Sequence, residues 1–68
     1  MNAIQNNLRH YRELKGLTQQ QVANFLGFKS TARISKWEKG VQYPHVTNFI
    51  QLLKLYEITP FEVYEDGS

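Results

Sequence analysis

The sequence predicts an all-α fold, a compact bundle of five short helices. Apolar residues recur at spacings of three and four along most of the chain, and no stretch shows the period of two that is typical of strands. Residues that favour helix starts and helix ends separate these apolar segments. A chain of 68 residues suffices for one domain. We assign residues 1–65 to that domain and residues 66–68 to a frayed tail.

The first helix is expected near residues 4–15. Ile4, Leu8 and Tyr11 lie at positions i, i+4 and i+7, which places them on one apolar face. Gly16 follows, and glycine readily adopts the left-handed conformation that ends a helix.

The second helix is expected near residues 19–26. Thr18 is a good N-cap, and Gln21, three residues later, can return a hydrogen bond to the Thr18 amide. Gly27 ends the helix in the same way as Gly16. The residues expected on its buried face are Val22, Ala23 and Leu26.

The third helix is expected near residues 30–39, with Ser30 or Thr31 as its N-cap and Gly40 at its end. Its inward-facing residues, three positions apart, are Ile34 and Trp37. This spacing favours a core position for the tryptophan over a role as an exposed stacking surface.

The last two helices are expected near residues 46–56 and 60–64. The apolar stripe of the longer helix consists of Val46, Phe49, Ile50 and Leu53, and it is widened by Leu52, Leu55 and Tyr56. Thr59, Pro60 and Glu62 supply an N-cap, a proline at the first helical position and a glutamate at the third, which predicts the start of the short final helix.

Charge is distributed unevenly along the chain, although the net charge is only +2. Residues 1–40 carry seven basic and two acidic side chains, a net charge of +5, whereas residues 41–68 carry one basic and four acidic side chains, a net charge of −3. Such asymmetry indicates a polyanionic partner for the basic half. The alternative is an ordinary solvated surface with scattered lysines.

Several classes of site are absent from the sequence. The chain has no cysteine, so disulfides and thiolate metal sites are excluded, and neither His10 nor His45 has a second histidine at i+3 or i+4. No nucleophile with its base, carboxylate pair or phosphate-binding glycine loop is evident. We therefore expect no enzymatic activity, and no cofactor, metal or small-molecule ligand. The lack of a secretion signal and of a long apolar segment favours a cytoplasmic protein without a membrane partner.

The segment Leu17–Pro44 has the pattern of two short helices joined by a tight turn, the second with small polar and basic side chains outside. In this and its flanking segments, the chain resembles the lambda-repressor-like, Xre-type helix-turn-helix family over roughly residues 6–64. The matching elements, in chain order, are Leu8-Arg9, Arg12-Glu13, Lys15 to Gln19, Val22-Ala23, Leu26-Gly27, Ile34 to Gly40, and Pro44.

The resemblance implies that the third helix enters the major groove of DNA and that the second crosses the phosphate backbone. The residues implied to contact base edges are Thr31, Ala32, Arg33 and Lys36. Those implied to contact the DNA backbone are Gln19, Lys29, Ser30, Ser35, Lys39, Gln42 and Tyr43. For the two basic base-contacting residues, the alternative is a phosphate contact. For Thr31 and Ala32, methyl contacts with thymine compete with simple helix propensity.

Arg12 and Glu38 match family positions that commonly form an ion pair between the first and third helices, with a phosphate contact by Arg12 as the alternative. Two positions depart from the family pattern. One extra residue lies between Gly27 and Ile34, so the family positions can be aligned from either residue. Alignment from the core residue Ile34 makes Thr31 the first residue expected in the major groove, whereas alignment from Gly27 would make it Ser30. The other departure is a histidine at position 45, where the family usually has a serine or similar N-cap.

We therefore expect a sequence-specific regulator that binds double-stranded DNA, acting as a repressor and as a homodimer on a palindromic operator. The alternative is a protein-interaction or antitoxin-like module that uses the apolar surface of the last two helices. Self-association is expected through that surface, at Leu55, Phe61, Val63 and Tyr64. Phe25 lies beside its helix's apolar stripe, so we expect it to be partly exposed.

Overall fold

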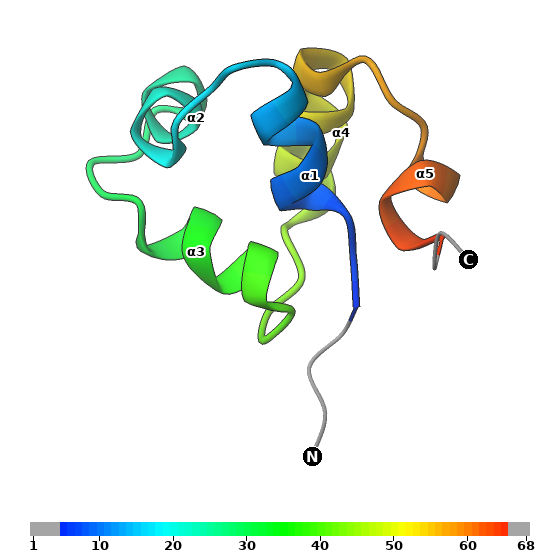
Figure 1. Ribbon diagram of the computed structural model, residues 1–68. Coiled ribbons are helices and arrows are strands. Elements are labelled where there is room, and N and C mark those ends of the chain that lie inside the picture. Colours follow the sequence, from blue (N-terminus) through cyan, green and yellow to red (C-terminus); the bar gives the residue numbers. More distant parts are fainter. Residues whose placement is uncertain (1–4, 66–68) are drawn as a thin grey trace.

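A computed structural model describes residues 5–65 of the chain. Five helices form this part, and it contains no strand. Their bounds are α1 Leu8–Leu14, α2 Gln19–Leu26, α3 Ala32–Lys39, α4 Val46–Tyr56 and α5 Pro60–Tyr64. In Figure 1, α2 and α3 lie on one side of the molecule and α5 on the other, with α1 and α4 between them. None of these helices is long and apolar enough to cross a membrane.

The hydrophobic core draws on all five helices. Its buried members are Leu8, Val22, Ala23, Ile34, Trp37, Leu52, Tyr56 and Val63. The inward positions of Ile34 and Trp37 follow the sequence prediction. Because both residues are nearly inaccessible to solvent, their packing fixes which face of α3 turns outward.

The first helix starts later than expected. Residues 5–7 are not helical, so α1 begins at Leu8, and Ile4 of the expected stripe lies outside the described residues. The side chain of Asn6 accounts for the difference. Its Oδ1 accepts a hydrogen bond from the Leu8 amide at 3.0 Å, while its Nδ2 donates to the carbonyl oxygen of Trp37 at 2.9 Å. These bonds replace a preceding helical turn.

Asn7 connects the start of α1 to α5. Its backbone amide donates to the Val63 carbonyl oxygen at 2.8 Å. Its side-chain Nδ2 donates to the carbonyl oxygens of Glu62 and Glu65, at 2.8 and 2.7 Å. The carbonyl groups at the end of a helix lack partners within it, so Asn7 satisfies groups that α5 cannot satisfy by itself.

Two capping boxes form as the sequence predicts. At the start of α2, Thr18 Oγ1 accepts from the Gln21 amide at 3.0 Å, and Gln21 Oε1 accepts from the Thr18 amide at 2.8 Å. At the start of α5, Thr59 and Glu62 make the equivalent pair, with Pro60 at the first helical position. Each box satisfies two backbone donors that have no partner within the helix.

The extra residue between α2 and α3 lies in the turn, not in either helix. Gly27 has φ +82°, and the next amide, of Phe28, donates to the Ala23 carbonyl oxygen at 2.8 Å, so α2 ends as predicted. The third helix begins at Ala32 instead of residue 30. Ser30 therefore lies outside the helix, where its Oγ accepts from the Ala32 amide at 3.3 Å.

The apolar stripe predicted for α4 was partly wrong. Val46 and Ile50 were expected to be buried, yet they are 65% and 45% exposed, whereas Leu52 and Tyr56 are buried. Apolar residues surround much of this helix, so their spacing alone does not decide which of them face the core. The helix ends at Glu57, which has φ +60° and is the one described residue other than glycine with a positive φ.

Candidate nucleic-acid interface

The outward face of α3 carries small and basic side chains. Behind this face lie the buried anchors Ile34 and Trp37. The exposed residues are Ala32, Arg33, Lys36 and Lys39, while Thr31 and Ser35 are half-buried. Thr31 stands at the N-cap of α3, where it makes no side-chain capping bond. The residues expected to contact base edges therefore lie together, one at the N-cap of α3 and the others exposed along this helix.

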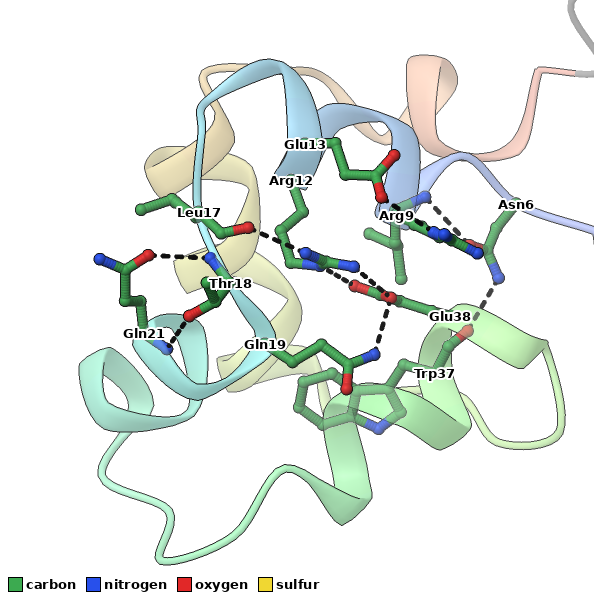
Figure 2. Close-up of polar contacts among 11 residues, drawn as sticks. Asn6, Arg9, Arg12, Glu13, Leu17, Thr18, Gln19, Gln21, Trp37 and Glu38 are labelled. Carbon is green, nitrogen blue, oxygen red and sulfur yellow. Dashed lines mark hydrogen bonds and ion pairs between the residues drawn. The ribbon is translucent and has the colours of Figure 1, made fainter.

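A buried ion pair holds α3 against α1. The guanidinium of Arg12 meets the carboxylate of Glu38 through two hydrogen bonds, Nε to Oε2 at 2.6 Å and Nη2 to Oε1 at 3.1 Å (Figure 2). The two side chains are 10% and 6% exposed. The third guanidinium nitrogen, Nη1, donates to the Leu17 carbonyl oxygen at 2.8 Å. The hydrogen bond with Glu38 raises the pKa of Arg12 above its ordinary value.

Gln19 joins the same network from α2. Its Nε2 donates to Oε1 of Glu38 at 3.0 Å, so Glu38 is shared between the first and second helices. The sequence assigned Gln19 to a phosphate of the DNA backbone. In the structure, this side chain fixes α3 relative to α2. The orientation of the exposed face of α3 thus depends on polar contacts with both neighbouring helices.

A shallow hollow lies above this network. The side chains that line it are Arg9, Arg12, Gln19, Ser35, Glu38 and Lys39. Three of them, Gln19, Ser35 and Lys39, were assigned to the DNA backbone from the sequence, and the structure brings them together around one concave surface. The amide groups at the start of α2 and the cations at the rim make this surface suitable for a phosphate.

Arg9 is a candidate that the sequence interpretation missed. It extends from α1 into the same hollow, where it is largely exposed and pairs with Glu13 at 3.0 Å. Its position as the first basic residue of the chain was a visible signal. However, only the packing of α1 against α3 shows that it lies beside Lys39, 30 positions later in the sequence.

The turn before α3 forms a second hollow at the other end of this helix. Its lining residues are Gly27, Phe28, Lys29, Ser30 and Arg33. Lys29 and Ser30 are exposed, and the guanidinium of Arg33 lies over the ring of Phe28. Two cations therefore flank the turn that contains the extra residue.

The loop after α3 carries the remaining expected backbone contacts. Gln42 and Tyr43 are exposed and line a third hollow together with Arg33 and His45. The ring of Tyr43 also makes an edge contact with Tyr64, with centroids 6.3 Å apart. This loop therefore links the outward face of α3 to α5.

The helix-turn-helix family model matches residues 8–63, which is most of the chain. The chain belongs to the Xre, lambda-repressor-like helix-turn-helix family. It is accordingly a DNA-binding regulator, with α2 and α3 as the helix-turn-helix. No match was found among curated proteins or among solved structures.

The surface expected for self-association of this helix-turn-helix domain needs a correction. Val63 was assigned to the interface, but it is fully buried in the core, because α5 packs this side chain inward. Leu55 is half-buried against the core. Phe61 and Tyr64 remain exposed, at 73% and 39%, and Phe25 of α2 is exposed as expected.

Proposed function

We propose that this helix-turn-helix protein is a sequence-specific transcriptional regulator that represses as a homodimer bound to a palindromic operator. The observation that carries the proposal is the construction of α3. Ile34 and Trp37 are anchored in the core, Glu38 is bound to two other helices, and small and basic side chains face outward. A helix held in this way can enter the major groove without losing its orientation.

In this proposal the DNA contacts fall into two groups. Base edges are contacted by Thr31, Ala32, Arg33 and Lys36. Backbone contacts come from Gln19, Lys29, Ser30, Ser35, Lys39, Gln42 and Tyr43, to which the structure leads us to add Arg9. The two basic base-contacting residues match the acceptor pair of guanine, and the methyl groups of Thr31 and Ala32 suit the thymine methyl group.

Selection of binding sites from random duplexes tests the proposal most directly, because it reports specificity, symmetry and half-site spacing together. A palindrome with half-sites one helical turn apart, about 34 Å, is expected. If about four basic residues of each subunit contact phosphate, affinity falls by about 10³–10⁵ between 50 and 200 mM salt. Enrichment of no sequence, or an affinity that does not change with salt, would contradict the proposal.

A matched pair of charge reversals locates the interface. Lys36→Glu places a negative charge on the outward face of α3 and is expected to abolish binding to the selected duplex. Lys15→Glu makes the same charge change at an exposed position just after α1, outside both the proposed DNA contacts and the exposed apolar residues of α4 and α5, so binding is expected to persist. Equal losses in both variants would show that net charge, and not α3, determines binding.

Dimerisation is supported by exposed apolar side chains on α4 and α5. They are Val46, Ile50, Phe61 and Tyr64. A two-fold symmetric dimer formed through these side chains would present two copies of α3 to the two half-sites of a palindrome. Repression would then follow from occlusion of the bound operator. Sedimentation over a range of protein concentrations measures this association directly. A chain that remains monomeric at high concentration and on its operator would contradict it.

The same exposed residues favour one alternative, a protein-interaction or antitoxin-like module that binds another protein through α4 and α5. Lys36→Glu separates the two functions. A module of this kind keeps its protein partner when α3 loses its charge, whereas a DNA-binding repressor loses its operator.

A further inference from the structure

Three side chains form a stack from the core to the outward surface beside α3. The indole of Trp37, 3% exposed, meets the ring of Phe28 edge to face, with centroids 5.8 Å apart and an interplanar angle of 68°. The guanidinium carbon of Arg33 lies 4.7 Å from the centroid of the Phe28 ring. Arg33 is exposed and Phe28 is half-buried, so the stack ends at the surface.

The backbone of the turn fixes the position of Phe28. The left-handed conformation of Gly27 reverses the chain, and the hydrogen bond from the Phe28 amide to the Ala23 carbonyl oxygen ties the residue to α2. Since Trp37 is also fixed in the core, the ring that lies beneath Arg33 has little freedom to move.

A guanidinium group on an aromatic ring is restrained but keeps its hydrogen-bond donors. The guanidinium group is planar, and its N–H groups point outward in that plane. Stacking on a ring therefore covers the face of the guanidinium and leaves its N–H groups available to bind. A restrained side chain loses less conformational entropy when it binds. Lys36, the other basic base-contacting candidate, has a flexible stem and no described aromatic partner.

We propose that Phe28 is a positioning residue that presents the edge of Arg33 to a guanine, and that Arg33 thereby determines specificity at one base pair of each half-site. The inference rests on the proposed function and extends it. Guanine offers O6 and N7 as a pair of acceptors in the major groove. A restrained guanidinium group meets both with a fixed, planar pair of donors, whereas an ammonium group meets them as a flexible point charge.

Four single variants and one double variant test this inference on duplexes that differ at single base pairs. Arg33→Gln removes both the charge and the fork of the guanidinium group, and the double variant combines Phe28→Leu with Arg33→Lys. Phe28→Leu keeps apolar volume but removes the aromatic face, and Arg33→Lys keeps the charge but removes the fork. Phe25→Leu is the control, because Phe25 is another phenylalanine near the end of α2 but is exposed and makes none of the described ring or cation contacts. Affinities for the operator are compared with those for duplexes in which one guanine is replaced by adenine.

Wild-type protein is expected to prefer guanine over adenine at one position by about 5- to 150-fold. Phe28→Leu and Arg33→Lys are each expected to lose most of that preference at the same position, and the double variant loses no more than Arg33→Lys alone. Phe25→Leu is expected to keep the preference. Thermal melting of each variant separates a change in specificity from a loss of folding.

Three results would overturn the inference. The first is an unchanged guanine preference in Phe28→Leu. The second is an equal loss of affinity for all duplexes in Arg33→Gln together with a weaker salt dependence, which would assign Arg33 to a phosphate in the hollow that it shares with Lys29. The third is an additive effect of the two substitutions. Failure of the proposed function looks different, because wild-type protein would then prefer no sequence at all.

Discussion

Arg12 and Glu38 lie 26 positions apart in the sequence and meet inside the protein through two hydrogen bonds, the shorter of 2.6 Å. Glu38 also accepts from Gln19, so one carboxylate joins three helices. The pair has two effects. It satisfies the polar groups of two buried side chains, and it sets the angle at which α3 faces outward.

We expect Glu38→Gln to destabilise the fold by about 3–5 kcal/mol, because it leaves the buried Arg12 guanidinium without an opposite charge. Urea denaturation followed by the fluorescence of Trp37 measures this change. The control is Glu13→Gln, which breaks the exposed Arg9–Glu13 pair and should cost less than about 1 kcal/mol. Similar losses in both variants would show that burial of the Arg12–Glu38 pair is unimportant.

A better N-cap at the start of α4 is expected to stabilise the protein. His45 occupies the N-cap and makes no side-chain capping hydrogen bond, whereas Thr18 caps α2. His45→Ser is therefore expected to raise the free energy of unfolding by up to about 1 kcal/mol, and Thr18→Ala to lower it by about 1 kcal/mol. Chemical denaturation of both variants checks these values. A loss of stability in His45→Ser would show that the histidine ring contributes packing that the serine cannot replace.

Substitutions of two residues of α5 are expected to have opposite effects, one on stability and the other on self-association. Val63→Ala truncates a fully buried side chain and should cost about 2 kcal/mol of stability without changing self-association. Phe61→Ser should leave the melting temperature nearly unchanged and weaken self-association. Melting and sedimentation measured on both variants provide the comparison. Unaltered association in Phe61→Ser would remove this residue from the proposed interface.

The buried hydroxyl group of Tyr56 is expected to make the fold less stable at alkaline pH. Burial raises the pKa of its hydroxyl group, and the negative charge of Glu38 acts in the same direction. The unfolded chain therefore releases this proton at a lower pH than the folded protein does. Stability falls as pH rises above about 10, by at most about 1.4 kcal/mol per pH unit for this one group. Tyr56→Phe should make the decline shallower, as measured by denaturation from pH 9 to about 11. An equally steep decline in that variant would assign the effect to other groups.

The features that the sequence predicted well depend on local signals. The capping boxes at Thr18 and Thr59 need only residues three positions apart, and Gly27 ends α2 through its own backbone conformation. The inward positions of Ile34 and Trp37 follow from two large apolar residues on an otherwise polar helix. These signals give the five helices and their order.

The features that escaped prediction depend on contacts between distant segments. Asn6 replaces a turn of α1 by bonding to Trp37, and no local pattern shows this. Val46 and Ile50 look like core residues by spacing, yet they are exposed, whereas Leu52 and Tyr56, which were expected to widen the same stripe, are buried. Arg9 joins the candidate interface only through packing of α1 against α3.

The bonds of Asn7 to Glu62 and Glu65 bridge 55 and 58 positions of sequence and bear on the order of folding. A helix as short as α5 has little stability by itself, so we expect it to form when these contacts close. Closing so long a loop is entropically costly, whereas α2 and α3 assemble from nearby residues. Folding is therefore expected to proceed from the α2–α3 pair toward α5, with docking of the final helix as the last step.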